Sequence, residues 1–509
     1  MVRTLYGATV RVGTDRGNGV ASTPDGSASL AGEGVCNKFV TIPMSVTTLP
    51  PGPATPALAQ TAQWLLAPVQ FMESCRRRHG ETFTVRFTGF ERPMVLFSDP
   101  GAVRALYSER EQLLPPGRAL TLQPMVGPDS LLLIEGAAHL ERRRMMLPPF
   151  HGEQMRAFQT TMREIAETGI AAWPHGEVAL QPLTRELTLE VILRLVAGVT
   201  DPERLARMRS LIPHLLDDGA SVSMSVRVLL ARRFGRSDPL EALTAQIREL
   251  DRHLLDEIAQ RRELSGADRG DVLSMLLAAR FEDGRGMSDR ELRDQLVTLL
   301  VAGHETTATA LAWAFELLTH NRPALERLVR EVRDGDGEDK WLRAVIAETL
   351  RLRPVVPLAG RRLAAELACE GYTLPVGTDV SPAIWLTHTR PDLYEDPYAF
   401  RPERFLAEPP STYAWIPFGG GVRRCLGAAF AELELRVVLR AVLERFDVSS
   451  SHGPEPVMRR GPTFAPRHGT RVRLRPAYTS SESRRPSSPS VSSTRGSAAA
   501  VRRHEPSAP

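Results

Sequence analysis

The spacing of hydrophobic and polar residues predicts two groups of strands in this chain. In TFTVRFTGFERPMVLFS (82–98), Phe83, Val85 and Phe87 alternate with polar residues, and this period of two predicts a β-hairpin. A second cluster of short strands is expected in 363–388, where GYTLPVG supplies turn residues. Both groups are small compared with the rest of the chain.

Between these groups the pattern is overwhelmingly helical, from Asp99 to about residue 355. Asp99 and Pro100 predict a helix start, because aspartate caps a helix and proline suits its first turn. The longest helical pattern covers roughly 289–320. We therefore expect a mainly α fold with a small β portion, of the α+β class.

The two ends of the chain differ from the middle in composition. Residues 477–509 are rich in Ser, Pro and Arg and have almost no large apolar residues, which predicts a disordered tail. Residues 1–43 are rich in Gly, Ser and Thr and are expected to form a disordered extension. Residues 44–476 are then expected to form a single domain. Because Met44 lies just before LPPGP (49–53), where the patterning begins, we treat it as an alternative translation start.

Charge and cysteine content exclude several classes of protein. The net charge of +4 comes from the two ends, which leaves the middle close to neutral, so we expect no nucleic-acid partner. The four cysteines form no CxxC pair, which argues against a zinc site or a disulfide framework and fits a reducing compartment. No run approaches the ~18 apolar residues of a membrane span, and the N-terminus lacks a signal-peptide pattern. We expect a cytoplasmic protein without a membrane anchor.

The helix expected at 289–320 contains LLVAGHETTATALAWAF, in which several residues do not suit a buried helix. Glycine costs about 1 kcal/mol in a helix interior, and Glu305 inside an apolar run is costly unless it is hydrogen-bonded. One interpretation is a kinked helix with a surface glutamate. The other is a locally opened helix in which Glu305 and Thr306 face a small ligand and pass protons to it. We interpret His304 as a core histidine.

Two further segments carry charged residues at helical spacing. In AETLRLRP (347–354), Glu348 and Arg351 share one helix face, either as an exposed pair or, together with Arg404 of FRPERF, as a buried network. In HLERRRMMLPPF (139–150), His139 and Arg143 lie one turn apart. They form either a clamp for anionic groups or part of a solvated basic helix.

The segment FGGGVRRCLG (418–427) surrounds one cysteine with glycines, which by itself describes an ordinary cysteine in a tight turn. In combination, AGHETT, ETLR, PERF and FGGGVRRCLG, in this order, resemble the motifs of the cytochrome P450 family of haem-thiolate monooxygenases. The resemblance runs from about residue 49 to about residue 475. The last segment matches every specified position of the family pattern F-G-x-G-x-R-x-C-x-G, with Phe418, Gly419, Gly421, Arg423, Cys425 and Gly427.

The resemblance implies a cytochrome P450 fold that holds haem b between the long central helix and the cysteine loop. Cys425 would be the thiolate ligand of the iron, with its charge favoured by backbone N–H groups of the following helix. Phe418 would cover the flank of the sulfur, and Gly427 would allow close helix approach. The haem propionates would be held by Arg423 together with His139, Arg143 and Arg361.

The resemblance also assigns roles to the polar residues of the helices. Glu305 and Thr306 would be the acid–alcohol pair that supplies protons for splitting O2. Glu348, Arg351 and Arg404 would form a structural triad behind the haem. The distal lining would come from 118–134, from residues near 213–230, from Val355 to Ala359 and from Pro462 to Ala465. These segments are mainly apolar, which predicts a hydrophobic substrate such as a terpenoid, fatty acyl chain, steroid or polyketide.

No redox domain accompanies the segment of family resemblance, so electrons are expected from a separate ferredoxin and ferredoxin reductase. The expected docking face is a cationic patch of Arg142, Arg144, Arg353 and Arg424. We expect a monomer. Two alternatives remain at this point. The first is a haem-thiolate isomerase, dehydratase or peroxide-driven peroxygenase, against which the Glu305–Thr306 pair argues. The second is a haem-based sensor, which would need an output domain.

Overall fold

The computed structural model describes residues 49–109, 113–114, 123–220, 241–264, 269–335, 338–407 and 410–477. All of them belong to one compact unit, Thr47–Pro509, whereas Met1–Val46 form a second unit. The expected disordered extension, the alternative start at Met44 and nearly all of the expected tail lie outside the described residues.

The described helices account for most of the regular structure. The α-helices are α1 (Ala57–Leu66), α2 (Pro68–His79), α3 (Pro100–Ser108), α5 (Gly136–Met146), α6 (Glu153–Ala171), α7 (Leu180–Leu195), α8 (Pro202–Ala220), α10 (Glu241–Glu263), α11 (Val272–Ala278), α12 (Asp289–Thr319), α13 (Arg322–Asp334), α14 (Lys340–Leu352), α15 (Ile384–His388) and α16 (Ala428–Arg445). Short 3-10 helices are η1 (Pro148–Phe150), η2 (Pro402–Phe405) and η3 (Gly421–Arg423).

The strands are short and form small sheets. They are β1 (Thr82–Val85), β2 (Met94–Phe97), β3 (Gly176–Ala179), β4 (Arg361–Arg362), β5 (Leu367–Cys369), β6 (Tyr372–Leu374), β7 (Asp379–Pro382), β8 (Phe446–Ser449), β9 (Val457–Arg460), β10 (Thr463–Pro466) and β11 (Arg471–Pro476). The sheets have the orders β1-β2-β7-β4, β3-β11-β8, β9-β10 and β5-β6. The expected mainly α fold with a small β portion is confirmed.

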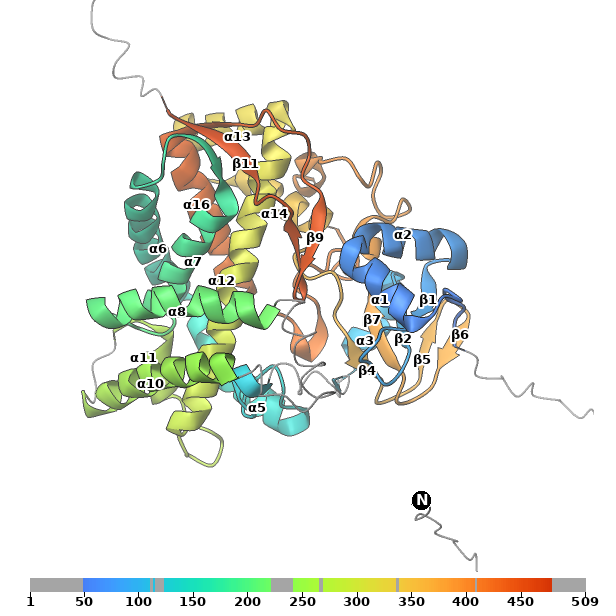
Figure 1. The fold of residues 1–509 in the computed structure, drawn as a ribbon, viewed down its shortest axis with the longest axis horizontal. Coiled ribbons are helices and arrows are strands. Elements are labelled where there is room, and N and C mark those ends of the chain that lie inside the picture. Colours follow the sequence, from blue (N-terminus) through green and yellow to red (C-terminus); the bar gives the residue numbers. More distant parts are fainter. Residues whose placement is uncertain are drawn as a thin grey trace, which may run out of the picture. The chain divides into compact units, whose positions relative to one another are not determined.

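Helix α12 runs through the middle of the helical part, with α7 and α16 packed along it (Figure 1). It begins with a capping box, in which the Ser288 hydroxyl accepts from the Glu291 N–H and the Glu291 carboxylate accepts from the Ser288 N–H. From Leu292 onward most of its residues are buried, which explains why this helix is apolar on nearly every side.

The expected hairpin and the expected helix start at Pro100 are both present. β1 and β2 pair antiparallel, with Phe83 opposite Leu96, and the Asp99 carboxylate accepts from the Ala102 N–H at 2.7 Å. The sequence alternation predicted one polar face for β1, but Thr84 is also buried. Its hydroxyl donates to the Pro50 carbonyl at 2.6 Å, so the N-terminal segment covers the second face of the strand.

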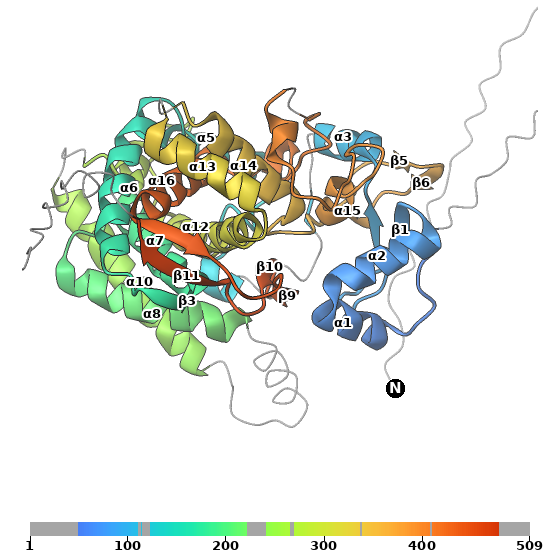
Figure 2. The same ribbon diagram turned by 90° about the horizontal axis from the view of Figure 1, so that it is seen from above.

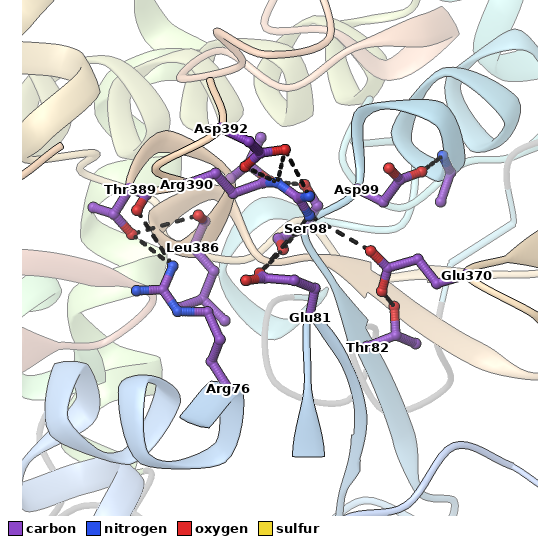
Figure 3. Close-up of polar contacts among 12 residues, drawn as sticks. Arg76, Glu81, Thr82, Ser98, Asp99, Glu370, Leu386, Thr389, Arg390 and Asp392 are labelled. Carbon is purple, nitrogen blue, oxygen red and sulfur yellow. Dashed lines mark hydrogen bonds and ion pairs between the residues drawn. The ribbon is translucent and has the colours of Figure 1, made fainter. Parts of the chain in front are cut away.

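Arg390, in the segment that follows α15, contacts the start of β1 and the turn between β5 and β6 (Figure 3). Its guanidinium lies 2.9 Å from the Asp392 carboxylate, 3.5 Å from that of Glu370 and 3.8 Å from that of Glu81. The Thr82 hydroxyl donates to the Glu370 carboxylate at 2.7 Å. Segments that are far apart in the sequence are thus held together by one cation. In Figure 2, the strands β1, β5 and β6 lie beside the helices that surround α12.

The sequence patterns did not predict β3 or the C-terminal strands β8 to β11. β11 pairs with both β3 and β8, and its Val472 and Leu474 are buried while the flanking arginines Arg471 and Arg473 are exposed. The alternation of apolar and charged residues in RVRLRP is therefore a period-two signal in the sequence that indicates this strand.

Candidate active site

The loop before α16 has a backbone that only glycine adopts readily. Gly419 and Gly421 have φ values of 66° and 65°, in the left-handed region. A Cβ on Gly420 would lie 2.2 Å from the Tyr107 ring, so glycine is required there for space. This geometry explains the three successive glycines and identifies Tyr107 of α3 as a residue that packs directly against the cysteine loop, which the sequence did not indicate.

Cys425 lies at the end of this loop, where two backbone groups fix its position. Its N–H donates to the Phe418 carbonyl at 2.9 Å, and the Gly427 N–H is hydrogen-bonded to its sulfur. Cys425 is open to solvent on one side and enclosed by protein on the others, and this enclosure raises the pKa of its thiol. The Gly427 N–H and the cations of Arg143 and Arg424 act in the opposite direction and favour the thiolate.

Cys425 differs clearly from the other described cysteines. Cys75 and Cys369 are buried, and burial raises the pKa of each thiol to about 11. Arg78 near Cys75 and the Thr82 hydroxyl near Cys369 act to lower these pKa values, but burial outweighs them, so both are thiols in the core. Of the described cysteines, Cys425 alone is presented to a ligand.

Two other residues of the motif have different surroundings from those expected. Phe418 is partly buried and packs with its ring centroid 6.2 Å from that of Trp415. A Cβ on Gly427 would meet no described atom within 4 Å, so close helix approach does not explain this glycine. The structure instead gives its N–H a role, as the donor to the Cys425 sulfur.

The four residues expected to hold propionates are brought together from three elements: α5 carries His139 and Arg143, β4 carries Arg361 and η3 carries Arg423. His139 is buried on α5, and its pKa is lowered to about 4, first by burial and then by the positive charges of Arg423, Arg143 and Arg361. All three arginines therefore lie near His139 and add like charge to one place. Such an excess of positive charge suits an anionic partner with two carboxylates.

Backbone contacts hold these cations in position. Arg423 donates to the Ile134 carbonyl at 2.6 Å, and Arg361 donates to the Gly360 carbonyl at 2.8 Å. The charge of Arg361 also acts on Tyr107, whose pKa is raised to about 12 by burial despite this cation. Arg143 acts on Cys425 as well as on His139, so it connects the cation cluster with the cysteine loop.

Helix α12 is continuous through Gly303, which corrects the expectation of a locally opened helix. The Thr306 hydroxyl donates to the Ala302 carbonyl at 2.7 Å and the Thr307 hydroxyl to the Gly303 carbonyl at 3.0 Å, so local side-chain bonds satisfy the two threonines. Gly303 is needed for packing, because a Cβ there would lie 2.3 Å from the Ile192 side chain of α7. Burial of α12 is nevertheless incomplete at 301–303 and at 305–306, where Ala302 is exposed, although His304 between them is buried.

Glu305 is held by two arginines that no sequence motif indicated. Its carboxylate lies 2.7 Å from Arg185 of α7 and 3.5 Å from Arg460 of β9, and its side chain is 14% exposed. Both arginines also form ion pairs with Asp217 of α8, whose side chain is 48% exposed. We call these four residues the Glu305 network.

His304 lies beside this network and is buried, as expected of a core histidine. Burial and the neighbouring arginines lower its pKa to about 3, so it is neutral. Neither of its ring nitrogens has a hydrogen-bond partner among the described residues. It is therefore a core residue, but it lacks the hydrogen bonds that buried histidines normally make.

Glu348 and Arg351 form a fully buried, two-point ion pair on α14. The Arg351 nitrogens lie 2.6 and 2.8 Å from the two carboxylate oxygens, and both side chains are 0% exposed. Glu348 also accepts from the Arg401 N–H at 2.9 Å and lies 3.4 Å from the Arg404 guanidinium. These residues connect α14 with the segment around η2, and we call them the Glu348 network.

Only two of the four arginines expected in the docking patch are exposed. Arg144 and Arg424 are exposed, although Arg144 is paired with Glu282. Arg142 is buried and pairs with Glu291 at 2.6 Å, and burial lowers the pKa of Arg353, which lies over the Trp313 ring. The assignment of Arg142 and Arg353 to a docking face was therefore wrong.

Part of the expected substrate lining can be located. The Phe464 N–H donates to the Val355 carbonyl at 2.7 Å, which brings the segment after α14 together with β10. The expected lining residues 118–122 and 221–230 lie outside the described residues.

The site residues fit a haem group. A single sulfur ligand on a glycine loop, next to a cluster of cations, matches an iron porphyrin with two carboxylates. The described part of the chain has no group of three or more His, Cys, Asp or Glu residues able to hold a metal ion. Iron bound to Cys425 would therefore need its other ligands from a porphyrin. In addition, the described helices include none that is long and apolar enough to cross a bilayer.

Comparison with known proteins gives a consistent result. Residues 50–469 match the family model of cytochrome P450. The putative cytochrome P450 135B1 of Mycobacterium bovis is 43% identical over 438 residues, covering 84% of this chain and 91% of the relative. The putative cytochrome P450 137 of Mycobacterium tuberculosis is 38% identical, again with 84% and 91% coverage.

Solved structures show the same fold. The retinoic acid bound cyanobacterial CYP120A1 superimposes with a TM-score of 0.71 at 27% identity, covering 84% of this chain and 99% of that structure. The heme domain of cytochrome P450DA has a TM-score of 0.73 at 23% identity, covering 84% and 98%. With a family model matched over most of the chain and a loop that presents one cysteine to a ligand, this protein belongs to the cytochrome P450 family of haem-thiolate monooxygenases.

Proposed function

We propose that this enzyme inserts one oxygen atom of O2 into a hydrophobic small molecule, with electrons from a separate ferredoxin and its reductase. The observation that carries the proposal is the Cys425 loop, whose sulfur receives a backbone N–H bond next to His139 and three converging arginines. These residues suit haem b, which would supply the oxygen-activating chemistry.

On the cysteine side, the chain holds and orients the haem. Cys425 provides the thiolate ligand, and the Gly427 N–H and Arg143 favour its charge. His139, Arg143, Arg361 and Arg423 provide donors for the two propionates, and their backbone anchors fix where those carboxylates lie.

On the opposite side, Thr306 and Glu305 handle protons. Thr306 is only partly buried, so its hydroxyl is available to the reacting oxygen, and the bond to the Ala302 carbonyl orients that hydroxyl. Glu305 exchanges protons with solvent water when it leaves the two arginines, which the partly exposed Asp217 then keeps paired. Release of Glu305 from Arg185 then allows it to reach Thr306.

The substrate is an apolar molecule of the terpenoid, fatty acyl, steroid or polyketide type. Val355 and Phe464, which belong to the expected lining segments, are apolar and are joined by a backbone hydrogen bond. The structural neighbour with retinoic acid bound indicates that this fold accommodates an elongated apolar ligand. A screen of such compounds for shifts in the haem absorption band would identify the class.

The function is tested by changing Cys425→Ala and recording the spectrum of the reduced protein with carbon monoxide. The red-shifted band of a thiolate-ligated haem should disappear, because no other described cysteine is presented to a ligand. Cys75→Ala and Cys369→Ala are matched controls and should keep the band. If the red-shifted band persisted in Cys425→Ala, the assignment of Cys425 as the thiolate ligand would be overturned.

A further inference from the structure

A buried histidine on α15 connects the Glu348 network with the segment that leads into the cysteine loop. His388 is 0% exposed, and each of its ring nitrogens has a backbone partner. Its Nδ1 atom lies 3.0 Å from the Arg351 carbonyl oxygen, and its Nε2 atom lies 2.9 Å from the Ile416 nitrogen. Ile416 comes two positions before Phe418, where the FGGGVRRCLG segment begins. One side chain therefore contacts both the buried ion pair and the start of the loop.

The two partners determine where the proton of the ring lies. A backbone N–H group can only donate, so Nε2 of His388 has to accept from Ile416 and carries no proton. A carbonyl oxygen can only accept, so Nδ1 has to carry the proton and donate it to Arg351. Both bonds are made only by a neutral ring with its proton on Nδ1. The other tautomer and the imidazolium cation would each place an Nε2 proton against the Ile416 N–H.

The surroundings of His388 favour this neutral ring. The Arg351 guanidinium donates to the His388 carbonyl at 2.7 Å, so this arginine contacts the histidine through its side chain as well as through its backbone. Burial, and then the positive charge of Arg351, lower the pKa of His388 to about 3. The ring is therefore neutral at neutral pH, as its two hydrogen bonds require.

Backbone hydrogen bonds continue from Ile416 to the cysteine. The Ile416 carbonyl accepts from the Gly419 N–H at 3.0 Å, which closes the tight turn where Gly419 has its left-handed conformation. The Phe418 carbonyl then accepts from the Cys425 N–H at 2.9 Å, and this bond sets the direction of the backbone from which the sulfur extends. A shift of Ile416 would therefore be passed on to the Cys425 sulfur.

We propose that His388 is a positioning residue for the iron ligand, which holds the cysteine loop in the orientation for thiolate ligation by accepting a hydrogen bond from the Ile416 N–H. The inference rests on the proposed function of Cys425 as the haem ligand. It gives the Glu348 network a second role in addition to stability, because Arg351 fixes the histidine that holds the loop.

Two substitutions separate the two hydrogen bonds of the ring. The amide oxygen of glutamine reaches about as far as Nε2, so His388→Gln can still accept from Ile416 but loses the bond to Arg351. The amide nitrogen of asparagine lies near the position of Nδ1, so His388→Asn can still donate to Arg351 but leaves the buried Ile416 N–H without a partner. A merely structural role predicts similar results for the two variants, whereas a positioning role predicts different ones.

The reduced carbon monoxide complex of the haem-loaded protein reports on this difference. We expect His388→Gln to keep most of the red-shifted band. His388→Asn should lose most of it at unchanged haem content, because the loop no longer holds the sulfur in place. Tyr394→Phe is a matched control, since it also removes one buried hydrogen bond to this segment, from the Tyr394 hydroxyl to the Ala414 carbonyl at 3.0 Å. It should keep the band.

Hydrogen exchange of the backbone gives a measurement that is independent of activity and of the haem spectrum. In the wild type, the Ile416 amide should be among the most protected of residues 411–419, and rapid exchange there would overturn the proposal without any variant. In His388→Asn it should exchange about tenfold faster, and in His388→Gln at close to the wild-type rate.

The proposal is overturned if His388→Gln and His388→Asn lose the red-shifted band equally, or if His388→Asn keeps it. It is also overturned if Tyr394→Phe loses the band as fully as His388→Asn, because any contact of the segment would then suffice. Cys425→Ala tests the ligand itself. If that variant loses the band while the two histidine variants behave alike, only the positioning role fails and the proposed function stands.

Discussion

Glu348 and Glu305 are each held by two arginines, but they lie in very different surroundings. Glu348 is 0% exposed and meets Arg351 at two points, with a backbone N–H as a further donor. Glu305 is 14% exposed, and both of its arginines are shared with Asp217. The Glu348 network has no competing carboxylate among its described contacts, whereas the Glu305 network has one with access to water.

This difference shows how the same residue types serve two purposes. A buried pair with every contact satisfied has one arrangement, because the removal of either partner strands a charge. Arg185 and Arg460 have a second, partly exposed carboxylate partner in Asp217, so Asp217 and water can replace Glu305. The Glu348 network connects α14 with the segment around η2, whereas the Glu305 network, in the proposed function, allows movement of a proton.

The largest effect is expected for Arg351→Ala. Loss of this guanidinium leaves the Glu348 carboxylate buried without its two-point partner, which typically costs ~3–5 kcal/mol. We expect little folded, haem-containing protein, as measured by thermal unfolding and by haem content. Arg401→Ala is a matched control in the same region. Its side chain is 43% exposed and pairs with exposed acids, so a change of at most ~1 kcal/mol is expected. If Arg351→Ala and Arg401→Ala were equally stable, the buried ion pair would not stabilise the fold more than the exposed one.

Glu305→Gln should show the opposite result, with normal folding and poor turnover. The amide keeps the shape of the side chain but cannot carry the proton, and general acid catalysis is typically worth ~10²–10⁴-fold. We expect a loss of product formation in this range, with wild-type haem content and melting temperature. Glu190→Gln is a close control, because Glu190 also pairs with two arginines, Arg194 and Arg209, and is 12% exposed. Its turnover should be unchanged.

Thr306→Ala should uncouple electron use from product formation. Only one hydroxyl is lost, and α12 keeps its backbone bonds, so haem binding and stability should remain near the wild type. Reductant would still be consumed, with hydrogen peroxide replacing most of the product. Thr309→Ala removes a hydroxyl farther along α12, which contacts Gln181, and should stay coupled. A wild-type product yield per electron in Thr306→Ala would exclude its role.

The two networks also show what the sequence could predict. Glu348 and Arg351 are three positions apart on one helix, so local spacing was enough to place them together. The same holds for the hairpin and for α12, which depend on periodicity over adjacent residues. Asp217 and Arg460 are 243 positions apart, and their contact depends on how β9 packs near α8 and α12. Nothing in the local sequence around Arg185, Asp217 or Arg460 indicates that contact.

Burial was likewise difficult to predict for individual charged residues. Arg142 and Arg353 were expected on a docking surface because arginines are usually exposed. The structure buries Arg142 against Glu291 and partly buries Arg353 over the Trp313 ring, and these positions depend on the packing of several helices.

The smallest effect is expected for Asp217→Asn, which changes the competing acid of the Glu305 network and leaves Glu305 itself intact. Interactions with Arg185 and Arg460 lower the pKa of Asp217 overall, although partial burial acts to raise it. Its contribution to stability is therefore present at neutral pH and is lost as the pH falls through this lowered value. Because Asp217 is half exposed, the change in stability should stay below ~1 kcal/mol.

The effect of Asp217→Asn on turnover should be small but specific. Without the competing carboxylate, both arginines are available to Glu305 and hold it more firmly, so proton release slows. A difference of ~0.5 kcal/mol in this step corresponds to roughly a twofold slower turnover. Asp447→Asn, an acid of similar exposure that pairs with Arg333, should leave turnover unchanged and serves as the control. Faster turnover in Asp217→Asn would mean that Asp217 does not compete with Glu305 for the arginines.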